Sequence, residues 1–202
     1  MHKQRDTQNN IELESIRLAK SFLADDRNAF NKLILLHKRS VFNLCYRFLG
    51  DYDDADDCAQ EVFIKVSRSL KSFRFESSFS TWLYRITVNT CKNRLNSLEY
   101  RLKSRRVRID AARHMDNESK QIDIEDKSPS PATELIRKEI DRLIQGAINA
   151  LPAKQKLVVV LRDIEGKSYE EIVEITGFKL GTVKSKLSRA RQQLKEALEG
   201  KI

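Results

Sequence analysis

The sequence has little of what turn-rich, secreted or membrane-spanning proteins require. It contains only 6 glycines and 3 prolines in 202 residues, which is too few for a β-sheet fold with many tight turns. Its first ten residues are polar and lack the apolar core of a secretory signal. No apolar run approaches the roughly 20 residues that span a bilayer. We therefore expect a helical protein of the cytoplasm with no stable membrane insertion.

Cysteine and histidine are too sparse and too scattered for a cofactor-dependent catalyst. The three cysteines, Cys45, Cys58 and Cys91, form neither a C-x-x-C pair nor a disulfide framework. We interpret them as small buried side chains in a reducing compartment. The three histidines have no neighbouring metal ligands, and the sequence has no glycine-rich phosphate loop. The sequence thus predicts no enzyme: no catalytic residue, no metal site and no cofactor.

What the chain has in excess is positive charge. Lys and Arg number 38 against 29 Asp and Glu, so the net charge is +9. Such a surplus favours a polyanionic partner, either nucleic acid or an anionic membrane surface. Apolar residues recur at three- and four-residue spacing on both sides of a polar middle stretch, which predicts helices. The fold class we expect is all-α, with two small helical domains joined by a flexible linker.

Composition divides the chain into four segments. An N-terminal extension covers 1–25, and a first helical block covers 26–97. The linker over 98–132 is basic first and acidic later, and it closes with two X-Pro steps that disfavour helix. A second helical block covers 133–202.

The second block contains the pattern of a helix-turn-helix. Ser168 and Glu171 have the spacing of a capping box that starts a short helix, and Gly177 ends it. The next helix, over about 180–198, has one apolar face and one face of cations and small hydroxyl residues. Such a helix can enter the DNA major groove, although a solvated amphipathic hairpin is the alternative. The candidate residues for duplex DNA are Lys179, Thr182, Lys184, Ser185, Lys186, Ser188, Arg189 and Arg191.

The first block concentrates aromatic residues near its end. Five aromatics lie between Phe73 and Tyr84, beside cations and amides. Aromatic rings stack on unpaired bases at about 1–3 kcal/mol each, and amides can read a base taken out of its stack. The same rings can equally form a hydrophobic core, and periodicity does not decide between the two. The candidate residues for single-stranded DNA are Arg74, Phe75, Phe79, Trp82, Tyr84, Asn89, Lys92 and Asn93.

An acidic run at 54–63 interrupts this basic chain. Carboxylates at a helix start are stabilised by the helix dipole, which is a purely structural explanation. They also repel DNA, and this suits a surface that docks on another protein. Both interpretations stay open on these residues alone.

Three motifs, in this order and at this spacing, resemble bacterial sigma factors of the extracytoplasmic-function (ECF) class. They are Asp-Ala-Asp-Asp-Cys-Ala-Gln-Glu-Val-Phe at 54–63, Phe-Ser-Thr-Trp-Leu-Tyr-Arg-Ile at 79–86, and Ser-Tyr-Glu-Glu-Ile at 168–172 followed by 181–191. The resemblance runs from about residue 29 to 198. It implies sigma region 2 in the first block, sigma region 4 in the second, and a transcription initiation factor active in a stress response.

The resemblance also implies partners and a division of roles. The implied partners are core RNA polymerase, through its β′ clamp helices and β flap, promoter DNA, and an anti-sigma factor. The linker would thread the RNA exit channel of the polymerase. The docking surface would be the 54–63 helix, with Asp56, Asp57, Gln60, Glu61 and Phe63 as its candidate residues.

On DNA, the aromatic segment would hold the melted minus-ten element, with one flipped base near Asn89 and Asn93. The final helix would read the minus-thirty-five element in the duplex. Its expected base contacts are Lys184, Ser185, Ser188 and Arg189, and its expected phosphate contacts are Thr182, Lys186 and Arg191.

Two stretches depart from the usual family pattern. Gly-Phe-Lys-Leu at 177–180 stands where a proline is common, and Phe75 and Glu76 stand where glycine and aspartate are frequent. The promoter sequence and the identity of the flipped base are therefore not transferred from the family.

Two other functions compete with this one. A conventional helix-turn-helix regulator would use the first block as a sensor or dimerisation domain, but such a domain does not need stacking aromatics beside cations. A membrane-surface protein would use the basic helix. The hydroxyls of Ser185 and Ser188 on the polar face argue against that.

Overall fold

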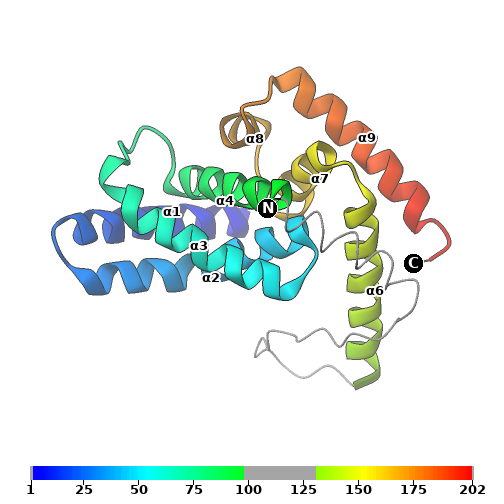
Figure 1. The fold of residues 1–202 in the computed structure, drawn as a ribbon, viewed down its shortest axis with the longest axis horizontal. Helices are drawn as coiled ribbons and strands as arrows, with labels where there is room; N and C mark the ends of the chain where they lie inside the picture. Colours follow the sequence, from blue (N-terminus) through cyan, green and yellow to red (C-terminus); the bar gives the residue numbers. More distant parts are fainter. Residues whose placement is uncertain (1, 98–130, 202) are drawn as a thin grey trace.

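The computed structural model describes residues 2–97 and 131–201, in which all regular structure is helical (Figure 1). The first stretch contains α1 (His2–Leu23), α2 (Arg27–Leu49), α3 (Tyr52–Ser69), a short 3-10 turn η1 (Leu70–Ser72) and α4 (Phe79–Asn96). The second contains α6 (Pro131–Ala150), α7 (Ala153–Val159), a π-helical turn η2 (Val160–Ile164), α8 (Tyr169–Thr176) and α9 (Leu180–Leu198). The predicted all-α fold class is confirmed. The predicted linker lies outside the described residues, except for its last two positions, which begin α6.

Local capping signals set the helix ends of the first stretch. Asp26 accepts hydrogen bonds from two amides at the start of α2, and Asp51 accepts one at the start of α3. Ser78 caps α4 by accepting from the amide of Thr81 at 3.0 Å. Gly50 ends α2 with a left-handed φ of +80°, which a residue with a Cβ adopts only under strain.

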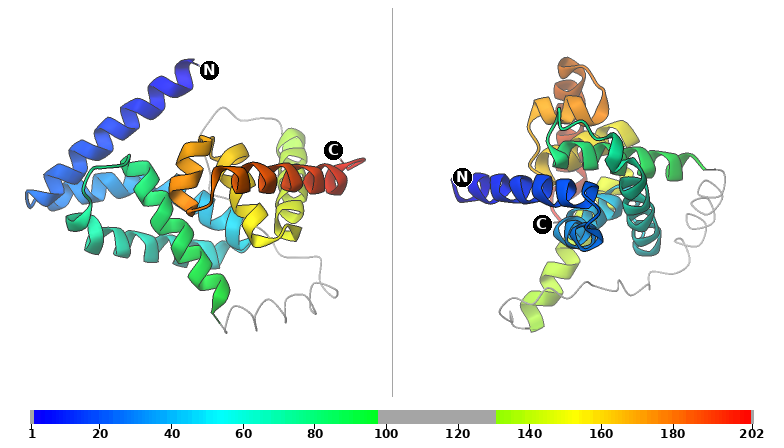
Figure 2. Two further views of the ribbon diagram at one scale, coloured as in Figure 1. Left: turned by 90° about the horizontal axis from the view of Figure 1, so that it is seen from above. Right: turned by 90° about the vertical axis from the view of Figure 1, so that its left-hand side faces the viewer.

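The N-terminal extension is a helix that belongs to the first bundle. Helix α1 packs against α2 and also touches α4, and Figure 2 shows its N-terminal end projecting away from α2 at an angle. The hydroxyl of Ser15 lies 2.7 Å from Nε2 of His37, and both residues are buried. Burial lowers the pKa of His37 to about 4, so its ring is neutral near pH 7. Glu12 accepts hydrogen bonds from the backbone amides of Phe79 and Ser80 at the start of α4.

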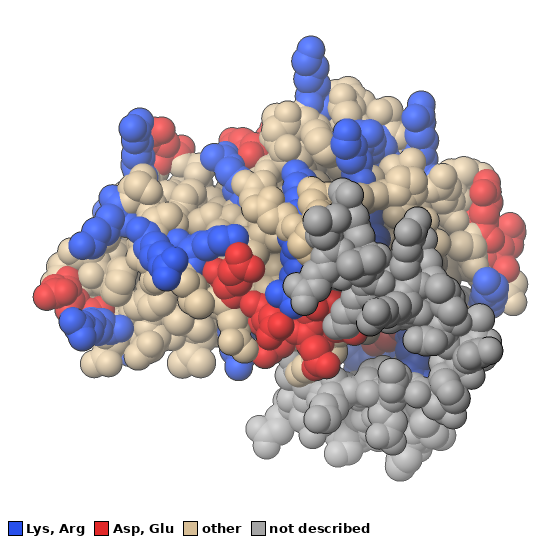
Figure 3. All heavy atoms as spheres, in the orientation of Figure 1, with Lys and Arg blue, Asp and Glu red and all other residues tan. Residues whose placement is uncertain are grey.

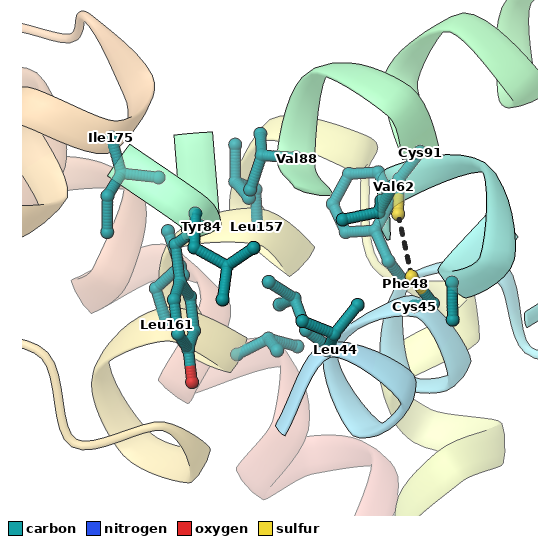
Figure 4. Packing of buried hydrophobic residues seen from close by; sticks show 14 of the residues in the cluster. Leu44, Cys45, Phe48, Val62, Tyr84, Val88, Cys91, Leu157, Leu161 and Ile175 are labelled. Atoms are coloured by element: carbon teal, nitrogen blue, oxygen red, sulfur yellow. Dashed lines mark hydrogen bonds between the residues drawn. The ribbon is translucent and has the colours of Figure 1, made fainter. Parts of the chain in front are cut away.

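The two helical stretches share one hydrophobic core (Figure 4). Leu44 and Phe48 of α2 and Val88 of α4 belong to the same buried cluster as Leu157 of α7 and Leu161 of η2. Each such side chain contributes about 1.5–3 kcal/mol relative to leaving it exposed. The two predicted domains are therefore packed together in this arrangement.

Polar side chains of the second stretch donate hydrogen bonds to backbone carbonyls at the C-terminal end of α2. The amide of Gln145 donates to the carbonyl of Arg47 at 3.4 Å, and the ammonium of Lys156 donates to the carbonyl of Phe48 at 3.4 Å. Carbonyls of the last helical turn have no partner within the helix, so these contacts satisfy groups that docking would otherwise bury unpaired. Burial lowers the pKa of Lys156 to about 8. None of the described helices combines the length and the apolar character needed to cross a bilayer.

Candidate nucleic-acid and protein interfaces

The α8–α9 pair has the geometry of a helix-turn-helix. The hydroxyl of Ser168 accepts from the amide of Glu171 at 3.1 Å, and the carboxylate of Glu171 accepts from the amide of Ser168 at 2.7 Å. This reciprocal pair is the predicted capping box. Gly177 ends α8 in a left-handed conformation, and α9 begins three residues later. The local signals read from the sequence therefore position α9 as expected.

Helix α9 buries one face and presents the other to solvent. Val183, Leu187 and Ala190 are buried against the rest of the second stretch. The opposite face carries no acidic residue from Leu180 to Lys195. Figure 3 shows basic side chains projecting from this end of the molecule. Among the predicted DNA contacts, Lys179, Lys184, Ser185, Ser188, Arg189 and Arg191 are exposed, and Thr182 and Lys186 are half-buried.

Aromatic and acidic neighbours order part of this basic face. The ammonium of Lys184 lies 5.9 Å from the ring centroid of Tyr169, within cation–π range. The guanidinium of Arg191 binds the carboxylate of Asp163 through two nitrogens, one at 3.0 Å, and this hydrogen bonding raises the pKa of Arg191. Tyr169, Lys184, Ser188 and Arg191 are among the residues that line a groove of about 360 Å³. Lys184 is thus available to a ligand, whereas Arg191 is already paired.

The structure places Phe79 in the core, contrary to its predicted contact with nucleotides. Its side chain is 1% exposed, and its ring centroid lies 5.6 Å from that of Trp82 and 5.3 Å from that of His37. Phe79 is the first residue of α4, and Leu83 follows one turn later on the same buried side. A ring enclosed in this way presents no face on which a base could stack.

Trp82, in the first turn of α4, keeps an open edge beside the loop that precedes this helix, and we call that loop together with Trp82 the Trp82 loop. Trp82 is half-buried and stacks on Phe73 with ring centroids 4.8 Å apart. Phe75 is also half-buried, with a positive φ of 57°, and it packs against Phe73 at 4.6 Å. Arg74, between them in sequence, is exposed. The segment around Trp82 is therefore not sealed inside the fold.

The remaining candidates on α4 differ in how far the second stretch covers them. Tyr84 is 6% exposed, and its hydroxyl donates to the carboxylate of Glu165 at 2.6 Å. Burial raises the pKa values of both Tyr84 and Glu165. Lys92 lies 5.9 Å from the ring of Phe178, while Asn89 and Asn93 are exposed. The predicted single-strand surface is thus open at Asn89, Asn93 and the Trp82 loop and covered at Tyr84.

Sequence reasoning missed one contact that covers this surface. The guanidinium of Arg85 donates from Nε to the backbone carbonyl of Glu174 in α8 at 3.2 Å. Arg85 is one residue beyond Tyr84 and is exposed apart from this contact. No local pattern indicates such a pair, because its partners are 89 residues apart in the sequence.

The predicted docking surface lies on the exposed side of α3. Asp57, Gln60 and Glu61 are exposed, and Asp56 and Phe63 are half-buried. Figure 3 shows acidic side chains gathered over the start of this helix. Within the acidic run, the buried Asp54 is held by Arg94 at 2.9 Å, whereas Asp57 and Glu61 face solvent and stay candidates for a protein contact.

An apolar residue on this surface was not among the predicted residues. Ile64 is 50% exposed and lies one turn beyond Gln60 and Glu61 on α3. The signal that could have found it is a large aliphatic side chain at i+3 and i+4 from polar surface positions. An exposed Ile among carboxylates is typical of a protein contact rather than a nucleic-acid contact.

Comparisons with known proteins agree on both halves of the chain. Residues 33–99 match the Sigma-70 region 2 family, and residues 141–194 match the Sigma-70, region 4 family. The chain is 37% identical over 174 residues to the RNA polymerase sigma-H factor of Pseudomonas aeruginosa, covering 86% of this chain and 88% of that protein. It is 36% identical over 177 residues to the ECF RNA polymerase sigma-E factor of Escherichia coli K12, covering 88% of each.

Solved structures show the same architecture. The sigma factor RpoE from Bartonella quintana, solved in complex with the anti-sigma factor NepR, superposes with a TM-score of 0.60 at 26% identity. That match covers 85% of this chain and 97% of the other. CnrH, solved in complex with the cytosolic domain of CnrY, superposes with a TM-score of 0.61 at 20% identity, covering 93% and 96%, and supports the fold alone.

Proposed function

The chain belongs to the sigma-70 family of bacterial RNA polymerase sigma factors, in its ECF class, and we propose that it directs core polymerase through three surfaces with separate tasks. It is a transcription initiation factor, and it recognises and holds DNA while the polymerase carries out the chemistry. The three surfaces are the basic face of α9, the Trp82 loop with α4, and the exposed side of α3.

The basic face of α9 reads the minus-thirty-five element as duplex DNA. The observation that carries the proposal is this acid-free exposed face, fixed in orientation by the capping box of α8 and the turn at Gly177. Lys184 and Arg189 supply donors for guanine edges and phosphates, and the small Ser185 and Ser188 let the helix backbone approach the groove. Arg191 contacts phosphate after exchanging its partner Asp163.

The Trp82 loop captures the melted minus-ten element. Arg74 contacts phosphates. The open edges of Phe75 and Trp82 provide a surface on which nucleobases stack, and the buried Phe73 packs beneath both rings. Asn89 and Asn93, exposed one turn apart on α4, offer amides for the edge of a flipped base. Phe79 supports this surface from the core.

The exposed side of α3 docks on core polymerase. Its carboxylates and Gln60 lie on the N-terminal side of the exposed Ile64, so a complementary partner supplies cations beside an apolar patch. We assign this partner to the β′ clamp helices, with a second contact on the β flap for the α8–α9 half. The protein acts in the cytoplasm, where polymerase and promoter DNA are found.

Binding to polymerase and DNA requires the two halves to separate. In the packed arrangement, Tyr84 and Arg85 bind Glu165 and the Glu174 carbonyl instead of DNA. A rigid polymerase that holds two weak DNA sites at the right spacing raises the effective concentration of each. An anti-sigma partner would act in the opposite direction by holding both halves away from the polymerase.

Run-off transcription tests this function. Core polymerase is given genomic fragments with the wild-type chain, with a Gln60→Ala/Ile64→Ala variant, or with no added chain. Discrete transcripts are expected only with the wild-type chain, because the variant loses the centre of the docking surface. Equal transcription in all three reactions would contradict the proposal, and tight promoter binding without polymerase would favour a conventional regulator.

A further inference from the structure

The three cysteines of the chain meet at one point in the interior. Cys45 lies on α2, Cys58 on α3 and Cys91 on α4, and each is 0% exposed. The sulfur of Cys91 lies 3.6 Å from that of Cys58 and 3.7 Å from that of Cys45, and the contact with Cys45 is drawn in Figure 4. All three sulfurs lie within 4.8 Å of one another.

The three cysteines are arranged as metal ligands, although their wide spacing in the sequence does not indicate this. A C-x-x-C pair supplies two thiols from one turn of chain, whereas here packing brings together one thiol from each of three helices. Three sulfurs bound to one centre at about 2.3 Å lie at most about 4.0 Å apart. Two of the three sides of the triangle are already within that limit. The third needs only a small movement of Cys45 and Cys58.

The donor set selects the kind of centre that fits. Thiolates prefer soft ions, which excludes magnesium and calcium. Structural zinc takes four tetrahedral ligands, and the described residues group only three metal-ligating atoms here. Two of the three sulfur separations lie below the planar limit, and this favours a pyramidal centre that sits above the plane of the three sulfurs.

Charge balance in the apolar core narrows the choice further. Three thiolates carry three negative charges, so a divalent ion leaves one net charge buried, and a trivalent centre leaves none. Arg94 is already held by Asp54 at 2.9 Å and Asp57 at 3.0 Å, so most of its positive charge is balanced before the site is occupied. We propose that Cys45, Cys58 and Cys91 form a binding site for a trivalent thiophilic metalloid of the arsenic(III) type.

The binding step balances without any oxidant or reductant. One molecule of As(OH)₃ condenses with three thiols to give one As(S-Cys)₃ group and three molecules of water. Three S–H and three As–O bonds break, three As–S bonds form, and each thiol proton leaves on a hydroxyl oxygen. Arsenic stays in the trivalent state, and both the reactant and the product are uncharged. An uncharged reactant also enters an apolar interior at lower cost than an ion.

Occupation of the site would cross-link three helices that carry function. It joins α2 to the polymerase-docking helix α3 and to α4, which carries the single-strand surface. The cross-link closes the segments 45–58 and 58–91, so it restricts the unfolded chain and stabilises the folded first half.

The test uses the full chain, reduced, with arsenite as the probe. Because the sequence contains only 3 cysteines, every thiol belongs to the site and the stoichiometry is unambiguous. We expect one arsenic bound per chain, loss of all three titratable thiols, and a mass gain of one arsenic less three hydrogens. The melting temperature should rise by about 5–10 °C at about 100-fold excess over the dissociation constant. Cys45→Ala, Cys58→Ala and Cys91→Ala should each weaken binding by about 100-fold, because two thiols remain.

Arsenic-edge X-ray absorption on the wild-type complex does not depend on variants that could fail to fold. Three sulfur neighbours and no oxygen neighbour would support the site. One or two sulfur neighbours, or no uptake by the folded chain, would overturn it. A larger rise in melting temperature with cadmium or zinc than with arsenite would overturn the assignment to a trivalent centre.

Discussion

The two DNA surfaces of the molecule differ in how they are presented. The basic face of α9 projects into solvent, and the helix is positioned by its neighbours in the second stretch, α6, α7 and α8. The surface on α4 is divided, because Glu165, just after η2, holds the buried Tyr84 and α8 contacts Arg85, while the Trp82 loop stays open. In the packed arrangement, the basic face of α9 is therefore free to contact a ligand, whereas the surface on α4 is partly covered by the second stretch.

Under the proposed function, this difference would control access to DNA. Duplex recognition needs a rigid helix, which local caps provide. Full capture of a melted strand would need the polymerase to separate the halves, because Tyr84 and Arg85 are engaged in the packed arrangement. The packed core and the polar contacts at the end of α2 set the free energy of that separation.

Gly50→Ala should have the largest effect, because it acts on the junction of the two halves. An added Cβ would lie 2.5 Å from the side-chain nitrogen of Asn149, and the left-handed φ alone costs about 1–3 kcal/mol. We expect a lower free energy of unfolding and separated halves, measured by denaturation and by fluorescence energy transfer between labels on the two halves.

A double-mutant cycle isolates the interface part of that loss. Asn149→Ala removes the clash with the added Cβ but leaves the backbone strain at residue 50. Compared with Gly50→Ala alone, the double variant should therefore regain contact between the halves more fully than it regains its free energy of unfolding. If Gly50→Ala leaves the distance between the halves unchanged, the close approach at this glycine does not control docking.

Trp82→Ala should impair promoter opening more than closed-complex binding. Loss of one stacking ring is worth about 1–3 kcal/mol, roughly a 5- to 150-fold effect on the open complex. Permanganate footprinting of the melted strand measures it. Phe79→Leu is the matched control, because it perturbs the same cluster from the core and should lower stability without a selective loss of opening. Unchanged opening by a folded Trp82→Ala variant would remove the stacking role.

Lys184→Ala should weaken polymerase-dependent binding by about 1–3 kcal/mol, and only on promoters with the cognate upstream element. Arg191→Ala is the comparison on the same helix. This variant should lose less binding free energy than Lys184→Ala, because Arg191 is already paired with Asp163. The loss should be the same on every DNA sequence, because the expected contact is to phosphate. Competition binding of the holoenzyme to matched and scrambled upstream elements measures both. An equal loss for Lys184→Ala on scrambled DNA would make it a phosphate contact.

The smallest effect concerns pH. The pKa of Lys156 is lowered by burial from 10.5 to about 8 in the docked state, so the separated state binds more protons between these values. Docking should therefore strengthen as pH rises, by about 1 kcal/mol from pH 8 to pH 9. Below pH 8 the dependence should disappear, because the lysine is protonated in both states. Lys156→Gln, followed by energy transfer across the same pH range, should remove the change.

Much of the fold could be predicted from the sequence because its signals are local. The capping box at Ser168, the turn at Gly177 and the apolar stripe of α9 involve neighbours within a few residues, and their physics does not depend on the rest of the chain. The acid-free face of α9 follows from the same periodicity. These features determined that one helix would be exposed, basic and fixed in direction.

Only the tertiary structure decided which helical faces meet. Phe79 and Trp82 look equivalent in sequence, yet packing encloses the first and leaves an edge of the second open. Packing also covers Tyr84 with Glu165 and brings the three cysteines together from separate helices. Such contacts depend on the volumes and orientations of elements far apart in the chain. Helical spacing therefore fixed which residues share a face, and three-dimensional packing determined what that face touches.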